Sequence, residues 1–118
     1  GSVIACSDYV LIPTRAGVMD IEAVRMTEEL CVEFRKPYAF MLNMVAPNAK
    51  VTADMARHLR TGGRVLLEPF IAYRQSHSNA MFQGKTAGEL RDPPARQEID
   101  GLWQAVQDFV TKPKRAVA

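Results

Sequence analysis

Three short apolar segments alternate with longer amphipathic segments along the first 70 residues of the chain. The apolar segments cover residues 8–13, 39–45 and 65–67, and both faces of each would be largely hydrophobic in an extended conformation. Such segments are typical of strands buried on both faces of a parallel sheet. We therefore expect three parallel strands, with Asn43 as the polar interruption of the second.

An amphipathic pattern over residues 20–36 predicts the first helix, because apolar side chains recur there three or four positions apart. The Asp20 side chain is expected to cap the start of this helix by accepting hydrogen bonds from free first-turn amides. Pro37 is expected to end it, since proline lacks an amide hydrogen and disfavours a helical residue before it.

Two shorter helices are predicted in the middle of the chain. Apolar positions mark a helix over residues 51–59, and the glycines at 62–63 suit the left-handed backbone that often closes a helix. Residues 76–82 have room for a short helix, which Ser76 or Ser78 can cap.

The final helix has the clearest pattern. It is expected to start at Asp92-Pro93-Pro94, where an N-cap aspartate is followed by prolines of the first turn. Its apolar side chains recur at spacings of three and four: Ile99, Leu102, Trp103, Val106, Phe109 and Val110. We expect this stripe, Trp103 included, to pack in the core. A partner-binding role for Trp103 would need the stripe to be exposed.

We predict an α/β fold, because strands and helices alternate in the order strand, helix, strand, helix, strand. Right-handed crossovers would then build a parallel sheet with flanking helices. Three strands are few for a free-standing sheet of this kind. A sheet edge would then be exposed in the isolated chain, and we expect pairing with another copy or aggregation to cover it.

The composition of the 118 residues is that of an ordinary single domain, with 47% hydrophobic and 24% charged residues. Lys and Arg number 15 against 13 Asp and Glu, so the totals do not force a strongly basic face. The basic tail around Lys114 and Arg115 is either a nucleic-acid contact or a solvated chain end.

Cysteine and histidine positions do not indicate a metal site or a catalytic nucleophile. Cys6 and Cys31 do not form a C-x-x-C pair, and His58 and His77 have no neighbour at ligand spacing. The longest apolar runs fall far short of the ~20 residues of a membrane-spanning helix, and no secretory leader is visible. The protein is therefore expected to be cytoplasmic, without membrane contact.

Residues 71–89 carry the most specific motif. They read I-A-Y-R-Q-S-H-S-N-A-M-F-Q-G-K-T-A-G-E. This segment resembles the I-x-x-R-x-x-(aromatic)-x-x-A-x-x-x-G-x-(S/T)-x-x-E of the ParA family of deviant P-loop ATPases. His77 stands where that family more often has Tyr or Phe, and Ala16-Gly17 replaces its more usual Ser-Pro.

The resemblance extends from about residue 4 to about residue 110. The stretch A-C-S-D-Y-V-L-I-P-T resembles the family's A-D-x-V-L-I-P strand, and G-V-M-D resembles its P-x-x-x-D helix start. The stretch M-L-N-M-V resembles its x-L-N-x-V strand. The resemblance therefore implies a partial P-loop NTPase fold.

A phosphate-binding loop is missing, because no G-x-x-x-x-G-K-(S/T) occurs in the sequence. Residues 3–112 are therefore expected to be the C-terminal half of a ParA-like ATPase domain, with residues 1–2 left from a cleaved tag and residues 113–118 as a basic tail. The resemblance implies that the full-length parent uses ATP and Mg²⁺. This chain alone is expected to be inactive as an ATPase and to bind neither tightly.

The resemblance implies an adenine site built from Asn43, Pro69, Phe70 and Ile71. Asn43 ends a predicted strand at the edge where open α/β sheets bind ligands, and its amide can both donate and accept. Pro69 and Phe70 suit the flat apolar faces of the ring. The alternatives are that Asn43 only caps a loop and that Phe70 and Ile71 are core residues. No catalytic or metal-binding residue is predicted.

Four cations around the predicted short helix are candidates for contacts with DNA phosphates: Arg74, Lys85, Arg91 and Arg96. The resemblance implies that basic residues of this region bind DNA without reading its sequence. The alternative for each of them is a solvated surface charge.

The parent is therefore expected to be an ATPase that segregates plasmid or chromosome DNA. The resemblance implies a homodimer that binds nonspecific DNA and is stimulated by a centromere-binding partner protein. One alternative is a naturally truncated, non-catalytic assembly module that pairs with intact ParA-like subunits. Another is a related ATPase of the cell-division site or of conjugation.

Overall fold

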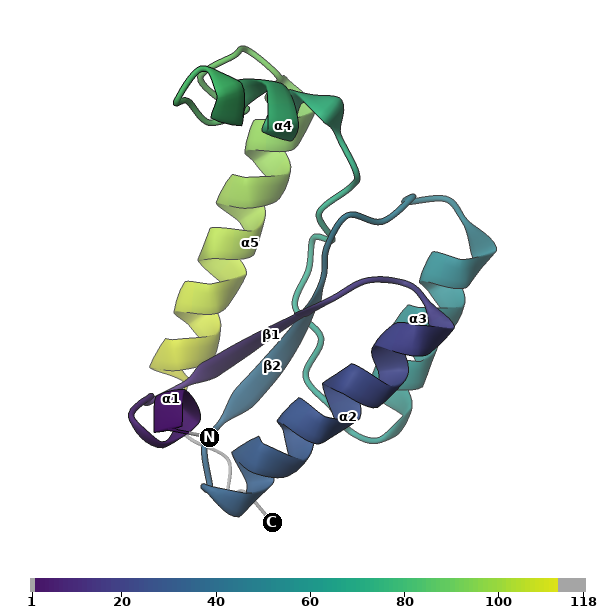
Figure 1. Ribbon diagram of the computed structural model, residues 1–118, viewed down its shortest axis with the longest axis vertical. Helices are drawn as coiled ribbons and strands as arrows, with labels where there is room; N and C mark the ends of the chain where they lie inside the picture. Colours follow the sequence, from purple (N-terminus) through teal and green to yellow (C-terminus); the bar gives the residue numbers. More distant parts are fainter. Residues whose placement is uncertain (1, 113–118) are drawn as a thin grey trace.

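The computed structural model of the protein describes residues 2–112 (Figure 1). In chain order the elements are α1 (Ser2–Ala5), β1 (Val10–Thr14), α2 (Val18–Glu33), β2 (Tyr38–Leu42), α3 (Lys50–Thr61), α4 (Gln75–Phe82) and α5 (Pro93–Thr111). Residue 1 of the predicted tag remnant and the predicted basic tail at 113–118 lie outside the described residues. Between residues 2 and 112, none of the helices has the length and apolar character needed to cross a membrane.

The two strands form a parallel sheet, and α2 makes the connection between them. The register pairs Val10 with Tyr38 and Thr14 with Leu42. All residues of β2 after Tyr38 are buried, as expected for a strand covered on both faces. The prediction of a mixed α/β fold with parallel strands and flanking helices is confirmed at this level.

The third predicted strand, at residues 65–67, is not a regular strand. Its segment lies beside β2 and forms isolated parallel bridges, between Leu66 and Phe40 and between Ala72 and Val45. Within the described part of the chain the sheet has two strands, so the prediction of three is wrong.

Pro69 explains why this third segment leaves the sheet. The Leu67 N–H donates to the Phe40 carbonyl at 2.8 Å, and a regular parallel ladder would next place the N–H of residue 69 on the Leu42 carbonyl. Proline has no N–H to donate. The Ile71 N–H donates to the Leu42 carbonyl instead, at 2.9 Å, so the intervening residues bulge out of the ladder.

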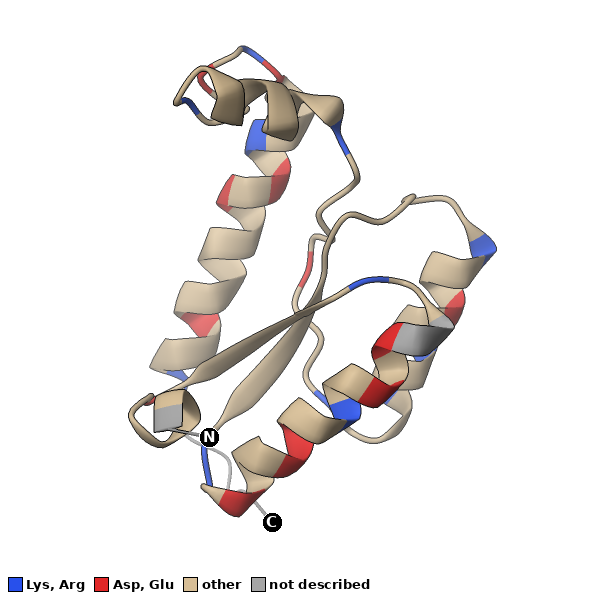
Figure 2. Ribbon diagram, viewed as in Figure 1, with Lys and Arg blue, Asp and Glu red and all other residues tan. Residues whose placement is uncertain are grey.

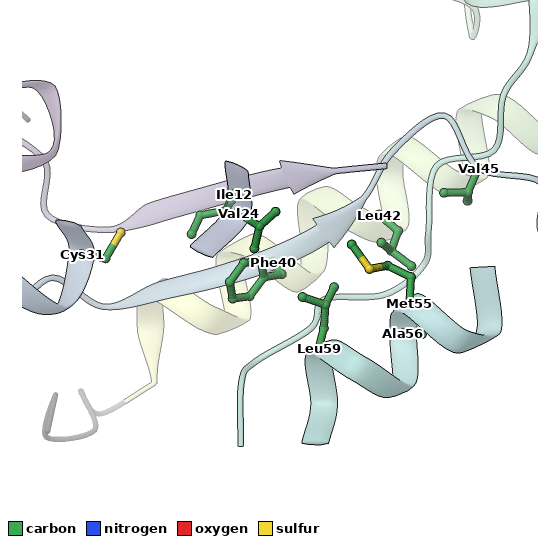
Figure 3. Close-up of a cluster of buried hydrophobic side chains, with 9 residues drawn as sticks. All are labelled: Ile12, Val24, Cys31, Phe40, Leu42, Val45, Met55, Ala56 and Leu59. Carbon is green, nitrogen blue, oxygen red and sulfur yellow. The ribbon is translucent and has the colours of Figure 1, made fainter. Parts of the chain in front are cut away.

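Helices cover both faces of the sheet and give three layers (Figure 1). Helices α2 and α3 lie on one face, over a core that includes Phe40, Leu42 and Leu59 (Figure 3). Helix α5 lies on the other face, where Leu102 joins Met41 in a second core. Because successive side chains of a strand point to opposite faces, β2 supplies both cores and is apolar throughout.

Helix α2 differs from the predicted helix at both ends. Its N-cap is Gly17, and Asp20 lies inside the first turn, so the prediction that Asp20 caps the helix is wrong. The helix ends at Glu33, and Arg35 takes a left-handed φ of 55°. The chain therefore leaves the helix before it reaches Pro37, which was expected to end it.

The start of α5 is confirmed, because the Asp92 side chain accepts a hydrogen bond from the Ala95 N–H at 3.2 Å. The predicted apolar stripe is only partly buried. Leu102 is buried, whereas Trp103 is 61% exposed and Ile99 is 46% exposed. The prediction that Trp103 packs in the core is wrong, because the stripe is wider than the narrow sheet that α5 covers.

Candidate functional site

An open cavity of about 300 Å³ lies at the carboxyl end of the sheet, where β1, β2 and the start of α2 meet. Thr14, Asp20 and Asn43 supply polar groups to its lining. Asn43 directly follows β2, and its backbone N–H donates to the Thr14 carbonyl at 2.9 Å. This bond fixes Asn43 at the edge where open α/β sheets bind their ligands.

The local sequence places these polar groups around the cavity. Thr14 is buried at the end of β1, and Asn43 is half-buried. The chain turns away from the sheet at Met44, which has a left-handed φ of 56°. Across the cavity, a Cβ at position 17 would lie 2.7 Å from Oδ2 of Asp20. The glycine at this position therefore leaves the space that the Asp20 carboxylate occupies.

A carboxamide, a carboxylate and a hydroxyl around one cavity can donate and accept several hydrogen bonds. Ile12 and Val24 add apolar lining. Arg15 and Asp20 add one charge of each sign to the lining, so the charges of the lining balance. In the part of the chain that the structure describes, no three His, Cys, Asp or Glu side chains are grouped to hold a metal ion.

The other three residues predicted for the adenine site do not line this cavity. Ile71 is buried in the core under α5, Pro69 lies against α5 at Gly101, and Phe70 lies on the α3 side. The Ile71 carbonyl accepts a hydrogen bond from the Val45 N–H at 3.1 Å. The backbone of residues 69–71 therefore reaches the residues that follow β2, but the side chains of these three residues do not line the cavity.

Arg74 is held by Glu98 of α5 in a two-point ion pair, with N–O distances of 3.1 and 2.9 Å. The same carboxylate accepts a hydrogen bond from the Ala72 N–H at 3.3 Å. The hydrogen bonds from Arg74 outweigh burial and lower the pKa of Glu98. Arg74 therefore joins the start of α4 to α5, and its charge is balanced inside the fold.

The other three cations predicted to contact DNA are exposed. Lys85 and Arg91 lie in the loop between α4 and α5, and Arg96 lies in the first turns of α5 (Figure 2). Arg96 is 3.6 Å from Asp100 in an exposed ion pair. Acidic residues, Glu89 among them, are interspersed with these cations, so this end of the molecule carries both signs of charge (Figure 2).

The long-range partners in this region could not be predicted from the sequence. Ser76 was expected to be able to cap α4, but the N-cap is Arg74, and the Ser76 hydroxyl donates to Asp92 at 2.5 Å. Glu98 was not singled out at all, although it holds Arg74. These partners lie 16 and 24 residues apart, and no local spacing rule connects residues at such distances.

Comparison of the chain with models of known protein families, with curated proteins and with solved structures gave no match in any of the three. A function for the chain therefore has to be argued from its residues and their geometry.

Proposed function

We propose that this chain is part of a DNA-partition ATPase of the ParA type, in which it forms the adenine side of the ATP site. The position of Asn43 is the observation that carries the proposal. Its carboxamide stands at the carboxyl end of a buried parallel strand, beside an open cavity. Adenine presents a donor and an acceptor side by side on one edge, and a carboxamide can match both.

The motif in residues 71–89 supports the choice of family. The sequence has no G-x-x-x-x-G-K-(S/T), so phosphate and Mg²⁺ contacts would come from residues that it does not contain. Cleavage of ATP is accordingly a property of the complete ATPase.

Nonspecific DNA is the proposed macromolecular partner, and Lys85 and Arg91 are the proposed contacts. Both are exposed in the loop between α4 and α5 and can reach a phosphate backbone. Arg74 is assigned a structural role because Glu98 already binds its guanidinium. A homodimer and a centromere-binding partner protein complete the proposed cycle.

Adenosine binding to the ¹⁵N-labelled chain tests the adenine assignment, because the nucleoside has the ring and lacks the phosphates. We expect millimolar adenosine to shift the backbone amide signals of Asn43 and Thr14. The Asn43→Ala variant should weaken this binding at least fivefold. Asn48→Ala is the matched control, since Asn48 is an exposed asparagine in the next turn of the same loop.

The proposal for the adenine site is wrong if adenosine binds both variants and the unmodified chain equally well. It is also wrong if adenosine shifts signals only in other parts of the protein. The thermal midpoints of the variants, measured in parallel, separate a lost contact from a lost fold.

A further inference from the structure

A second cavity, of about 550 Å³, lies between α3 and the segment at residues 68–70. Arg57, Arg60 and Thr61 line it from α3, and Glu68 and Phe70 line it from the other side. It is larger than the cavity beside Asn43 and has no lining residue in common with it. We refer to it as the α3 groove.

The groove exists because both of its walls are recessed. Ala53 and Ala56 stand on the α3 side, where larger side chains would fill the space. On the other side, the missing N–H of Pro69 makes residues 68–70 bulge away from β2. The same bulge that interrupts the sheet therefore forms one wall of the groove.

Arg60 and Phe70 lie close to each other in the lining of the groove. The guanidinium carbon of Arg60 lies 6.0 Å from the centre of the Phe70 ring, and its Nη2 donates to Glu68 at 2.7 Å. The guanidinium therefore lies within cation–π range of the ring. An aromatic ligand can stack on the planar guanidinium of Arg60 and contact Phe70.

Arg57 supplies a positive charge that is available to a ligand. Its side chain is 75% exposed, and its ion pair with Asp54 spans 3.5 Å between exposed groups. Such exposed pairs are weak and exchange readily for a better anion. Arg60 is likewise paired with a single exposed carboxylate, that of Glu68, so each arginine of the groove has one exchangeable partner.

We propose that the α3 groove binds a planar aromatic anion of the nucleoside monophosphate class. The ring packs against Arg60 and Phe70, and the phosphate binds Arg57, whose planar guanidinium matches phosphate oxygens in pairs. This site is additional to the proposed adenine site, because Asn43 lies in the other cavity.

Titration of the ¹⁵N-labelled chain with adenosine monophosphate (AMP) tests the site. We expect AMP to shift the amide signals of α3 and of residues 68–70, and adenosine or inorganic phosphate alone to shift them much less. Arg57→Gln should weaken AMP binding at least fivefold. Arg25→Gln is the control, since Arg25 is a similarly exposed arginine on α2 with a carboxylate 3.7 Å away. Phe70→Leu should also weaken binding, and its thermal midpoint shows whether the fold is intact.

The two proposals fail in distinguishable ways. If AMP shifts only the amide signals of Asn43 and its neighbours, the groove proposal is overturned and the adenine site stands. If AMP shifts the amide signals of α3 and Asn43→Ala leaves adenosine binding unchanged, the groove stands and the adenine assignment is lost. Equal AMP affinity of Arg57→Gln and Arg25→Gln would overturn the groove proposal directly.

Discussion

Arg64 donates two hydrogen bonds to the carboxylate of Glu28, at 2.7 and 3.0 Å, and so ties the chain after α3 to α2. The Tyr38 hydroxyl donates to the same carboxylate at 3.0 Å. Burial raises the pKa of Glu28, but the hydrogen bonds from Arg64 and Tyr38 outweigh burial and lower it overall. Burial and the bond to Glu28 raise the pKa of Tyr38 to about 12. The cluster joins three elements at the amino-terminal end of the sheet.

Replacing Glu28 should destabilise the fold. We expect Glu28→Gln to lower the free energy of unfolding by about 1–3 kcal/mol, because Arg64 then keeps a partly buried charge without its counterion. Urea unfolding followed by circular dichroism measures the loss. Glu29→Gln is the control: its carboxylate lies 3.7 Å from Arg25 in an exposed pair, so the change should stay within about 0.5 kcal/mol. Equal losses in the two variants would contradict this role of Glu28.

Acid should weaken the same cluster. The pKa of Glu28 is lowered in the folded state. Its contribution to the free energy of unfolding is therefore fully present above the pKa of the unfolded chain, about 4.3, and is lost as the pH falls through the pKa of the folded chain. The unfolding free energy of the unmodified chain should therefore fall between about pH 5 and pH 3. The unfolding free energy of the Glu28→Gln variant should fall less steeply over this pH interval. Parallel pH profiles would show that Glu28 does not contribute to the acid sensitivity.

Arg74 and Lys85 should behave differently when each is changed to glutamine. Arg74→Gln should lower the thermal midpoint, because Glu98 loses the partner that joins α4 to α5. Lys85→Gln should leave the midpoint unchanged and weaken binding of any duplex, with a smaller dependence on salt. Differential scanning fluorimetry and fluorescence anisotropy at several salt concentrations separate the two effects. The assignment fails if Lys85→Gln binds DNA like the unmodified chain and Arg74→Gln keeps its midpoint.

Gly101 should be intolerant of alanine, although it lies inside a helix. The change from glycine to alanine in a helix usually stabilises by up to about 1 kcal/mol. Here a Cβ would lie 2.9 Å from Cδ and 3.1 Å from Cγ of Pro69, whose ring cannot rotate away. We expect Gly101→Ala to cost about 1–3 kcal/mol of unfolding free energy. Gln104→Ala, at an exposed position of α5, is the control, and a gain in stability for Gly101→Ala would refute the contact.

Local signals predicted the elements that depend on local chemistry. The aspartate and prolines were sufficient to predict the start of α5, because the Asp92 cap bonds an amide only three residues away. Gly63, with a φ of 74°, ends α3 as expected. The apolar run in β2 was also sufficient, since a strand buried on both faces has a distinctive composition.

Features that depend on distant parts of the chain were not predictable. The prediction of a third strand was wrong because Pro69 cannot donate a hydrogen bond to the Leu42 carbonyl. Leu42 is far from Pro69 in the sequence, and only the register of the sheet brings the two segments together. The exposure of Trp103 depends on the width of the sheet under α5 and not on the pattern of α5 itself. For the candidate site, the sequence placed Asn43 at the carboxyl end of a strand over residues 39–45, whereas β2 ends at Leu42 and Asn43 directly follows it. The sequence could not show that Phe70 belongs to a different cavity.

The bulge at Pro69 also limits how copies of this chain can assemble. The segment around Pro69 is the neighbour of β2 on one side, and its broken ladder cannot offer a continuous row of donors to another strand. Within residues 2–112, β1 is paired with β2 alone. Val10 and Thr14 make backbone hydrogen bonds toward β2, so Pro13 faces the outer edge of β1, where it has no N–H to donate. A proline therefore interrupts the row of donors on each side of the sheet, and a strand from another copy cannot pair with either side through an unbroken ladder.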